Sequence, residues 1–219
     1  MHTGVHVITL GDMTETPPRN RRRDAQQNRE AILEAAARVL RGDPEASIDA
    51  IASAAGLSRR ALYGHFPSRE AILAELVARG TARIAAALSD VHDDDPARHV
   101  ALIGTALWGE IAHVRLVAQM IVRGPLEGAV AAGLEPIRAA LRDAVTRGGA
   151  TGVFRSDVEP RIVVRLVEET AIAVLDEAVA EGLDDASARR LVVVAALGVA
   201  GLSWRDADEV AEAVDGDAR

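Results

Sequence analysis

The sequence contains no cysteine and no lysine, and it has only five aromatic residues: two Trp, two Phe and one Tyr. Without cysteine there is no disulfide framework, no thiolate nucleophile and no zinc–thiolate site. This fits a reducing compartment without requiring one, and we take the cytoplasm as the default localisation. Strands are enriched in aromatic and β-branched residues. Alanine, the best helix former, occurs 43 times in 219 residues, so the composition favours helices.

Long hydrophobic runs are also missing. The longest apolar stretch, Leu191–Leu202, has 12 residues, whereas about 20 are needed to span a bilayer. Met1–Leu10 lacks both the basic segment and the long apolar run of a signal peptide. We therefore expect a soluble protein that has no membrane partner.

The net charge of −8 is unevenly distributed. Residues 1–80 carry 11 Arg and 10 acidic residues, a balance of +1, whereas residues 81–219 carry 14 Arg and 23 acidic residues, a balance of −9. Arg19 and Arg21–Arg23 form a basic cluster, and Gly56–Arg69 contains three arginines and no acid. Attraction to phosphate depends on the charge of the contacting face, so this front part is suited to nucleic acid. An ordinary solvated helical surface is the alternative.

The spacing of apolar and helix-breaking residues predicts an all-α fold. Residues 1–23 have no periodicity and are predicted to form a flexible basic arm, with helical order beginning near Asp24. Beyond this point apolar residues recur every three or four positions between breaks rich in Gly, Pro and Asp. The predicted helices run from near Asp24 to Arg41, Ile48–Ala55, Arg59 to before Pro67, Arg69–Leu88, Ala97–Gln119, Leu126–Arg147, Pro160–Glu181 and Ser187–Trp204, with possible interruptions at Arg123–Pro125 and Gly133–Pro136.

Residues 47–66 have the pattern of a helix-turn-helix motif. Ser47 and Ser58 can cap its two helices, and Gly56 provides the permissive backbone for the turn between them. The apolar residues of both helices are spaced to form one core, which leaves a polar face on the second helix. This outward face consists of Arg59, Arg60, Tyr63 and Gly64, near the end at which a recognition helix presents side chains to base edges in the major groove.

The same region resembles the TetR family of bacterial transcriptional regulators. The resemblance covers about residues 28–76 and rests on three blocks: Arg29-x-x-Ile32-Leu33-x-Ala35-Ala36, Ile51-Ala52-x-x-Ala55-Gly56-Leu57-Ser58, and Leu62-Tyr63-x-His65-Phe66-Pro67-Ser68-Arg69-Glu70-x-Ile72-Leu73. It implies that Tyr63 and His65 contact DNA phosphates. It also implies that Arg69 stands where the family usually has a phosphate-contacting lysine, and Ser47 where it usually has threonine. Arginine keeps the positive charge and serine keeps the hydroxyl, so anchoring to the DNA backbone is retained.

The predicted DNA-binding residues leave the base specificity open, because Arg59 and Arg60 replace the glycine or lysine that is common in the family at this place. Either arginine can be the one that reads a base. A packed Tyr63 and an ordinary charged tail at Arg21–Arg23 are the alternatives to phosphate contact and to insertion into a minor groove. The full predicted set is Ser47, Ser58, Arg59, Arg60, Tyr63, Gly64, His65 and Arg69.

Residues 71–219 exceed what DNA binding requires, and the resemblance implies that they form an effector pocket and a dimer interface. Residues 24–70 are then the helix-turn-helix domain. Pro160–Glu181 and Ser187–Trp204 are expected to pair with their copies in a homodimer, because Leu191–Leu202 is apolar on nearly all sides. Pocket candidates are polar or aromatic residues inside apolar helices, each of which can instead lie in the core or on the surface: Trp108, Glu110, His113, Met120, Glu168 and Thr170.

No pattern in the sequence supports an enzyme, and we expect no cofactor and no bound metal. His92-Asp93-Asp94-Asp95-x-x-x-His99 can ligate a divalent ion, but a helix cap before Pro96 is the simpler interpretation. Gly148–Gly152 lacks the preceding strand and the spacing of a phosphate loop and is interpreted as a linker.

The sequence therefore predicts a dimeric, ligand-responsive DNA-binding regulator, most simply a repressor that a small molecule releases from a two-fold operator. The helix from Arg69 to Leu88 is the expected lever between effector and DNA, because it begins at a predicted phosphate contact. An all-helical binding or enzyme module without DNA binding is the alternative.

Overall fold

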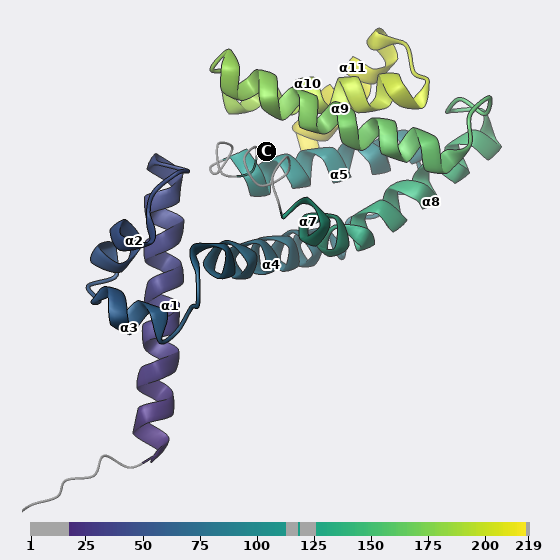
Figure 1. The fold of residues 1–219 in the computed structure, drawn as a ribbon. Coiled ribbons are helices and arrows are strands. Elements are labelled where there is room, and N and C mark those ends of the chain that lie inside the picture. The colour runs from purple at the N-terminus through teal and green to yellow at the C-terminus, as the bar shows by residue number, and fades with distance from the viewer. Residues whose placement is uncertain (1–17, 113–117, 119–125, 218–219) are drawn as a thin grey trace, which may run out of the picture.

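The computed structural model describes residues 18–112, 118 and 126–217, and within these residues it is helical without strands, as predicted. A small head formed by α1 to α3 stands at one end, and a larger bundle formed by α5 and α8 to α11 stands at the other (Figure 1). The helices are α1 Pro18–Gly42, α2 Ile48–Ala54, α3 Arg59–Tyr63, α4 Arg69–Leu88, α5 Pro96–Ile111, α7 Glu127–Gly133, α8 Glu135–Thr151, α9 Pro160–Ala180, α10 Asp185–Ala200 and α11 Trp204–Asp217. In this described part, no helix is both long and apolar enough to cross a membrane.

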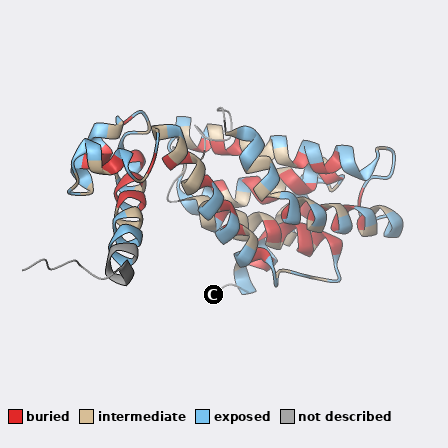
Figure 2. Ribbon diagram, turned by 60° about the horizontal axis from the view of Figure 1, so that its bottom comes forward, coloured by how far each residue is buried: buried red, intermediate tan, exposed pale blue. Residues whose placement is uncertain are grey.

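Buried apolar residues form two separate cores, one in the head and one in the bundle (Figure 2). The head core joins α1 to the helix-turn-helix, with Ile32, Ile51, Leu62 and Phe66 almost completely buried. The bundle core is larger and includes the deeply buried side chains of Trp108 and Phe154 among many Val, Leu and Ala side chains. Each part therefore has its own hydrophobic driving force for folding.

Helix α4 belongs to both cores. Ile72 and Leu73 near its N-terminus pack in the head, whereas Ile84 and Leu88 near its C-terminus pack in the bundle. Ser68 caps the helix, since its hydroxyl accepts a hydrogen bond from the Ala71 N–H at 3.2 Å. The predicted bounds of this helix are confirmed. Because its two ends are buried in different cores, a displacement of α4 in the bundle must also move the head.

The start of α1 differs from the prediction. The helix begins at Pro18, whereas the sequence was interpreted as a non-helical arm up to residue 23. Proline has a fixed φ that suits the first turn of a helix, and arginine is a good helix former, so residues without an apolar stripe still continue the helix. Residues 1–17 of the predicted arm lie outside the described residues.

The interpretation of Gly148–Gly152 as a linker is wrong. Helix α8 continues through this segment to Thr151, and only Gly152 leaves the helix, with φ +77°. Gly148 is buried because the ring of Phe154 packs directly against its Cα, where a side chain would collide. This glycine serves close packing rather than flexibility.

The last predicted helix, Ser187–Trp204, extends too far, and the helix that follows it was not predicted. Helix α10 ends at Ala200, and α11 begins at Trp204. Gly201 between them has φ +120° and approaches Arg155 so closely that a Cβ would lie 2.8 Å from the Arg155 nitrogen. The apolar pattern of Leu191–Leu202 hides this break, because a glycine that ends a helix contributes no polar signal.

Two other predicted breaks have different outcomes. Helix α7 ends at Gly133 and α8 begins at Glu135, which confirms the predicted interruption there. The predicted interruption at Arg123–Pro125 lies outside the described residues. Helix α5 ends at Ile111, and most of the segment from 112 to 119, which was predicted to continue this helix, also lies outside them.

Hydrogen bonds hold the His92–His99 segment against α8 of the bundle. Asp95 caps α5, as predicted, with its carboxylate 2.8 Å from the Ala97 nitrogen. The buried His99 ring lies with Nε2 3.2 Å from the Val91 carbonyl oxygen and Nδ1 2.8 Å from the Arg147 guanidinium. Burial lowers the pKa of His99, so its neutral form is favoured. Neutral histidine then donates from Nε2 and accepts from Arg147 at Nδ1.

Candidate nucleic-acid interface

Local capping builds the helix-turn-helix. The Ser47 hydroxyl accepts a hydrogen bond from the Ala50 N–H, and the Ser58 hydroxyl accepts one from the Ala61 N–H, each at 3.2 Å. Gly56 has φ +70°, the left-handed conformation that lets α2 end and the chain turn into α3. Both serines are exposed, so each hydroxyl keeps its proton for donation to an acceptor outside the protein. The predicted caps are confirmed, and their contact with DNA stays a prediction.

Arg29 on α1 fixes the position of the segment that follows α3. Its guanidinium donates to the His65 carbonyl oxygen at 3.1 Å, pairs with Glu75 at 3.0 Å and lies 4.1 Å from the centre of the Phe66 ring. These contacts join α1, the α3–α4 turn and α4. Arg29 stands in the first block of the family resemblance, but its contacts reach 36 to 46 residues along the chain, so spacing alone did not indicate this role.

Arg69 also holds protein backbone. Its Nε donates to the Ala46 carbonyl oxygen at 3.0 Å, and its Nη2 donates to the Pro44 carbonyl oxygen at 2.6 Å. The side chain thus ties the start of α4 to the loop between α1 and α2. The predicted contact of Arg69 with a phosphate would therefore use those N–H groups of the guanidinium that these two hydrogen bonds leave free.

The outward face of α3 carries the remaining predicted groups. Arg59 and Arg60 are exposed, and Tyr63 keeps 41% of its surface accessible. The Arg59 guanidinium lies 3.0 Å from the Asp49 carboxylate on α2 and 5.5 Å from the centre of the Tyr63 ring. A packed interior role for Tyr63 is therefore excluded. Asp49 is a member of this cluster that the sequence analysis missed, because its partner lies ten residues away on the next helix.

Gly64 and His65 form the end of α3. Gly64 caps the helix with φ −69°, and a Cβ there would lie 3.2 Å from the Ala61 carbonyl oxygen. His65 is half-buried, and its carbonyl oxygen is the acceptor for Arg29. Because Gly64 has no side chain, nothing protrudes from the surface beside Arg60, and a DNA groove can approach it closely.

The four predicted pocket residues that the structure describes do not converge on one site. Trp108 is 2% exposed in the bundle core, and its indole Nε1 has no hydrogen-bond partner in the described part of the chain. Glu110 pairs with Arg83 on α4 at 2.6 Å, and Glu168 pairs with Arg138 on α8. The Thr170 hydroxyl donates to the carbonyl oxygen of Leu166, one turn earlier in its own helix. His113 and Met120 lie outside the described residues.

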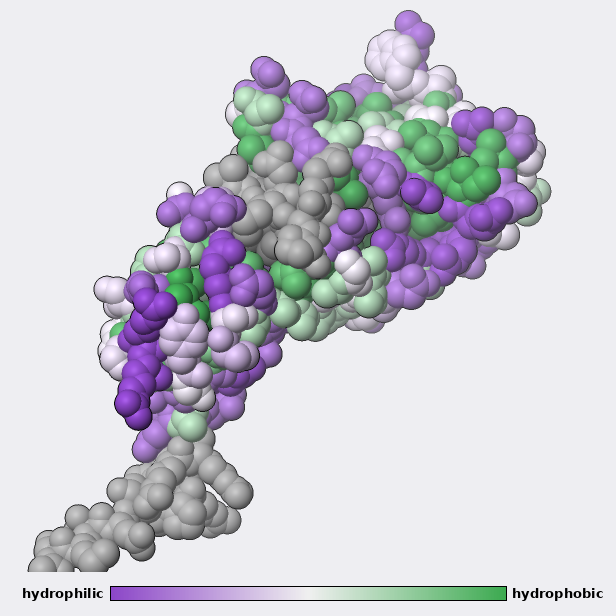
Figure 3. Space-filling model, viewed as in Figure 1, coloured by the Kyte–Doolittle hydropathy of each residue, from purple (hydrophilic) through white to green (hydrophobic). Residues whose placement is uncertain are grey.

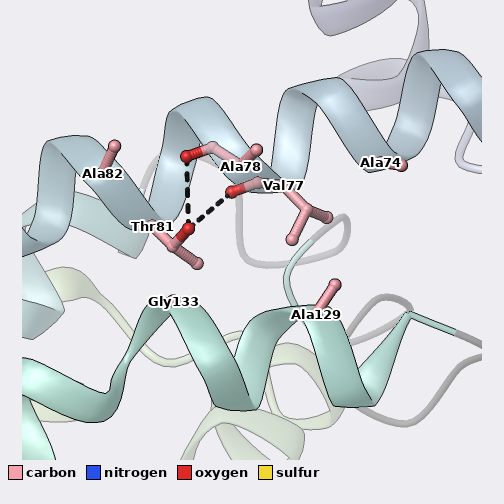
Figure 4. Close-up of a pocket in the computed structure, with 7 residues that line it drawn as sticks. All are labelled: Ala74, Val77, Ala78, Thr81, Ala82, Ala129 and Gly133. Atoms are coloured by element: carbon pink, nitrogen blue, oxygen red, sulfur yellow. Dashed lines mark hydrogen bonds between the residues drawn. The ribbon is translucent and has the colours of Figure 1, made fainter.

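A cavity of about 360 Å³ lies between α4 and α7 (Figure 4). In its lining Thr81 packs directly against Gly133, where a Cβ would collide with the threonine side chain. The Thr81 hydroxyl donates to the Val77 and Ala78 carbonyl oxygens. The lining is small and apolar, and it includes none of the predicted pocket residues. It consists of Ala74, Val77, Ala78, Thr81, Ala82, Ala129 and Gly133.

The geometry defines a class of protein: a helix-turn-helix head joined by one continuous helix to a helical bundle. Residues 32–76 match the profile of the bacterial regulatory proteins of the tetR family. The predicted resemblance to that family is thus confirmed over this segment of the chain. The family is one of transcriptional regulators and not of enzymes.

Solved structures share the fold over most of the chain. RolR in complex with resorcinol has 21% sequence identity and a TM-score of 0.63, with coverage of 86% of this chain and 95% of RolR. SmeT, the repressor of the Stenotrophomonas maltophilia multidrug efflux pump SmeDEF, has 22% identity, a TM-score of 0.61 and coverage of 80% and 91%. The fatty acid degradation regulator FadR from Bacillus halodurans has 19% identity, a TM-score of 0.62 and coverage of 80% and 95%. Sequence comparison with curated proteins found no match.

Proposed function

We propose that this protein is a homodimeric transcriptional regulator that binds operator DNA through α3 and releases it when a small molecule binds among the helices that follow the head. The exposed basic face of α3, with Arg59, Arg60 and Tyr63 on a rigidly capped helix, is the observation that carries the proposal. In the proposed division, residues 24–70 bind DNA, and residues 71–219 bind the effector and form the dimer. Helix α4 crosses this boundary, since its residues up to Leu73 pack in the head core.

DNA binding is tested by selecting bound sequences from random duplexes and measuring affinity at several salt concentrations. We expect an enriched two-fold site with half-sites about one helical turn apart, and an affinity that falls linearly on a log–log plot against salt. The double substitution of Arg59 and Arg60 by alanine is expected to abolish both enrichment and tight binding. Failure of the wild-type protein to enrich any sequence would contradict the proposal.

The C-terminal helices have an apolar surface suited to dimerisation. Ile162 and Leu166 on α9 and Leu191 on α10 are 40%, 44% and 41% exposed. In Figure 3 hydrophobic residues gather over part of the C-terminal helices, whereas much of the head is hydrophilic. Side chains of this size are rarely left in water over a continuous area, which supports an interface between two copies of α9 and α10.

Replacing Leu166 by arginine is expected to convert the dimer into a monomer. A two-fold interface contains each substitution twice, and burying two unpaired charges should raise the dissociation constant at least about 100-fold. Val153, which is 41% exposed in the turn after α8, provides the matched control, and Val153→Arg should leave the dimer intact. Sedimentation at micromolar concentration measures both. A wild-type monomer, or a dimer unaffected by Leu166→Arg and Leu191→Arg, would contradict the interface.

The proposed effector acts through α4. The cavity beside α4 and α7 adjoins the helix that connects both cores, so a molecule that displaces α7 from α4 would tilt the head. A two-fold operator requires the recognition helices about 34 Å apart, and a small tilt breaks that register. The complex of RolR with resorcinol supports a small molecule as the ligand class in this fold.

A further inference from the structure

Arg59 and Arg60 are neighbours in the sequence, but their surroundings differ. Arg59 pairs with Asp49 at 3.0 Å and covers the Tyr63 ring. Arg60 is exposed, and its guanidinium makes no hydrogen bond or ion pair with any other residue that the structure describes. The guanidinium of Arg60 therefore keeps all five of its donors, whereas that of Arg59 already has a carboxylate partner.

The two arginines also point in different directions. Leu62 is fully buried and marks the inward side of α3. At about 100° per residue, Arg60 lies about 160° from Leu62, nearly opposite the core, whereas Arg59 lies about 60° from it. Arg59 thus lies on the side of the helix that it shares with Tyr63. Arg60 lies on the ridge that faces away from the protein, next to the bare surface of Gly64.

We propose, on the basis of the proposed function, that Arg60 reads a guanine in each operator half-site and that Arg59, held by Asp49 and Tyr63, contacts the phosphate backbone. A free arginine fork can bond to both the O6 and the N7 of guanine in the major groove. An arginine paired with a carboxylate on the neighbouring helix is directed to the side of the recognition helix, where the DNA backbone borders the groove. Specificity and backbone attachment then belong to adjacent residues.

The test uses the full-length protein and the site enriched by the wild-type protein from random duplexes. Each guanine of a half-site is replaced in turn, and affinities are measured for the wild type, Arg60→Ala, Arg60→Lys and Arg59→Ala. One guanine replacement should weaken the wild type about 5- to 160-fold, the range of a bidentate contact. The same replacement should have no effect on Arg60→Ala, which has no donor at this position. It should have a smaller effect on Arg60→Lys than on the wild type, because lysine can donate to guanine but lacks the planar fork. Arg59→Ala should weaken all duplexes equally and keep the guanine preference.

The outcomes separate this assignment from the proposed function. If the wild type enriches no site, both the proposed function and this assignment fail. If a site is enriched and Arg60→Ala still discriminates every guanine as strongly as the wild type, the assignment is overturned while DNA binding stands. Loss of the preference in Arg59→Ala with retention in Arg60→Ala would reverse the two roles. Thermal unfolding of each variant controls for the fold, and both side chains are exposed, so the variants should unfold near the wild-type temperature.

Discussion

Replacing Gly148 by alanine is expected to destabilise the protein by about 2–4 kcal/mol, although alanine is the better helix former. A Cβ at this position would lie 2.7 Å from Cγ of Phe154, deep inside van der Waals contact. The obstacle is the base of the ring, which cannot turn away without moving the side chain. Phe154 is only 4% exposed, so its displacement sacrifices buried apolar area. For a chain of this size the melting temperature should fall by about 5–15 °C, as measured by calorimetry.

Gly149 is the matched control for this prediction. It is the next residue of the same helix, and a Cβ there would lie 3.7 Å from the Arg155 carbonyl oxygen, an ordinary contact. Gly149→Ala should therefore stabilise the protein by about 0.5–1 kcal/mol. In a Phe154→Ala background the clash disappears, and Gly148→Ala should also become stabilising. Equal effects of the two alanines in the wild-type background would show that the close contact at Gly148 does not determine stability.

Arg147→Met is expected to destabilise the bundle by about 2–4 kcal/mol, because one guanidinium satisfies four acceptors. It donates to the Asp94 and Asp93 carbonyl oxygens at 2.8 and 3.1 Å, to His99 Nδ1 at 2.8 Å and to the Asp143 carboxylate at 2.9 Å. His99 is 3% exposed, so its Nδ1 would lose its partner where water does not replace it. Denaturant unfolding measures the loss.

Arg142, on the same helix, is the control. It pairs with Glu135 at 2.9 Å, and the two side chains are 43% and 58% exposed. An exposed pair contributes about 0–1 kcal/mol, so Arg142→Met should have little effect. If both methionine variants lose the same stability, the buried acceptors do not account for the role of Arg147.

The pH dependence of stability provides a second readout of the Arg147 variant. Burial lowers the pKa of His99 in the folded chain, and the Arg147 charge lowers it further. The unfolded chain then binds more protons than the folded chain. The contribution of neutral His99 to wild-type stability is therefore fully present above about pH 6.5, and it decreases as the pH falls below that value. Arg147→Met removes one of the causes that lower the pKa of His99, so the decrease on acidification should become smaller.

The sequence alone predicted the parts of the fold that local chemistry controls. The caps Ser47, Ser58 and Ser68 act on N–H groups three residues away, and Gly56 acts through its own φ. Such short-range signals define α2, α3 and α4 to within a few residues, and with them the helix-turn-helix. The exposed face of α3 followed from the same periodicity.

Tertiary structure decided which of these residues are available for function. Arg29, Arg69 and Arg59 have the same side chain, and their sequence neighbourhood gives no sign that two of them hold backbone carbonyls and the third a carboxylate. Likewise, Gly148 resembles a linker until the ring of Phe154 is placed against it. In each case the residue that the side chain or glycine contacts belongs to another segment of the chain, which only folding brings close. A local pattern specifies the direction of a side chain along its own helix, but only the folded chain specifies what that side chain meets.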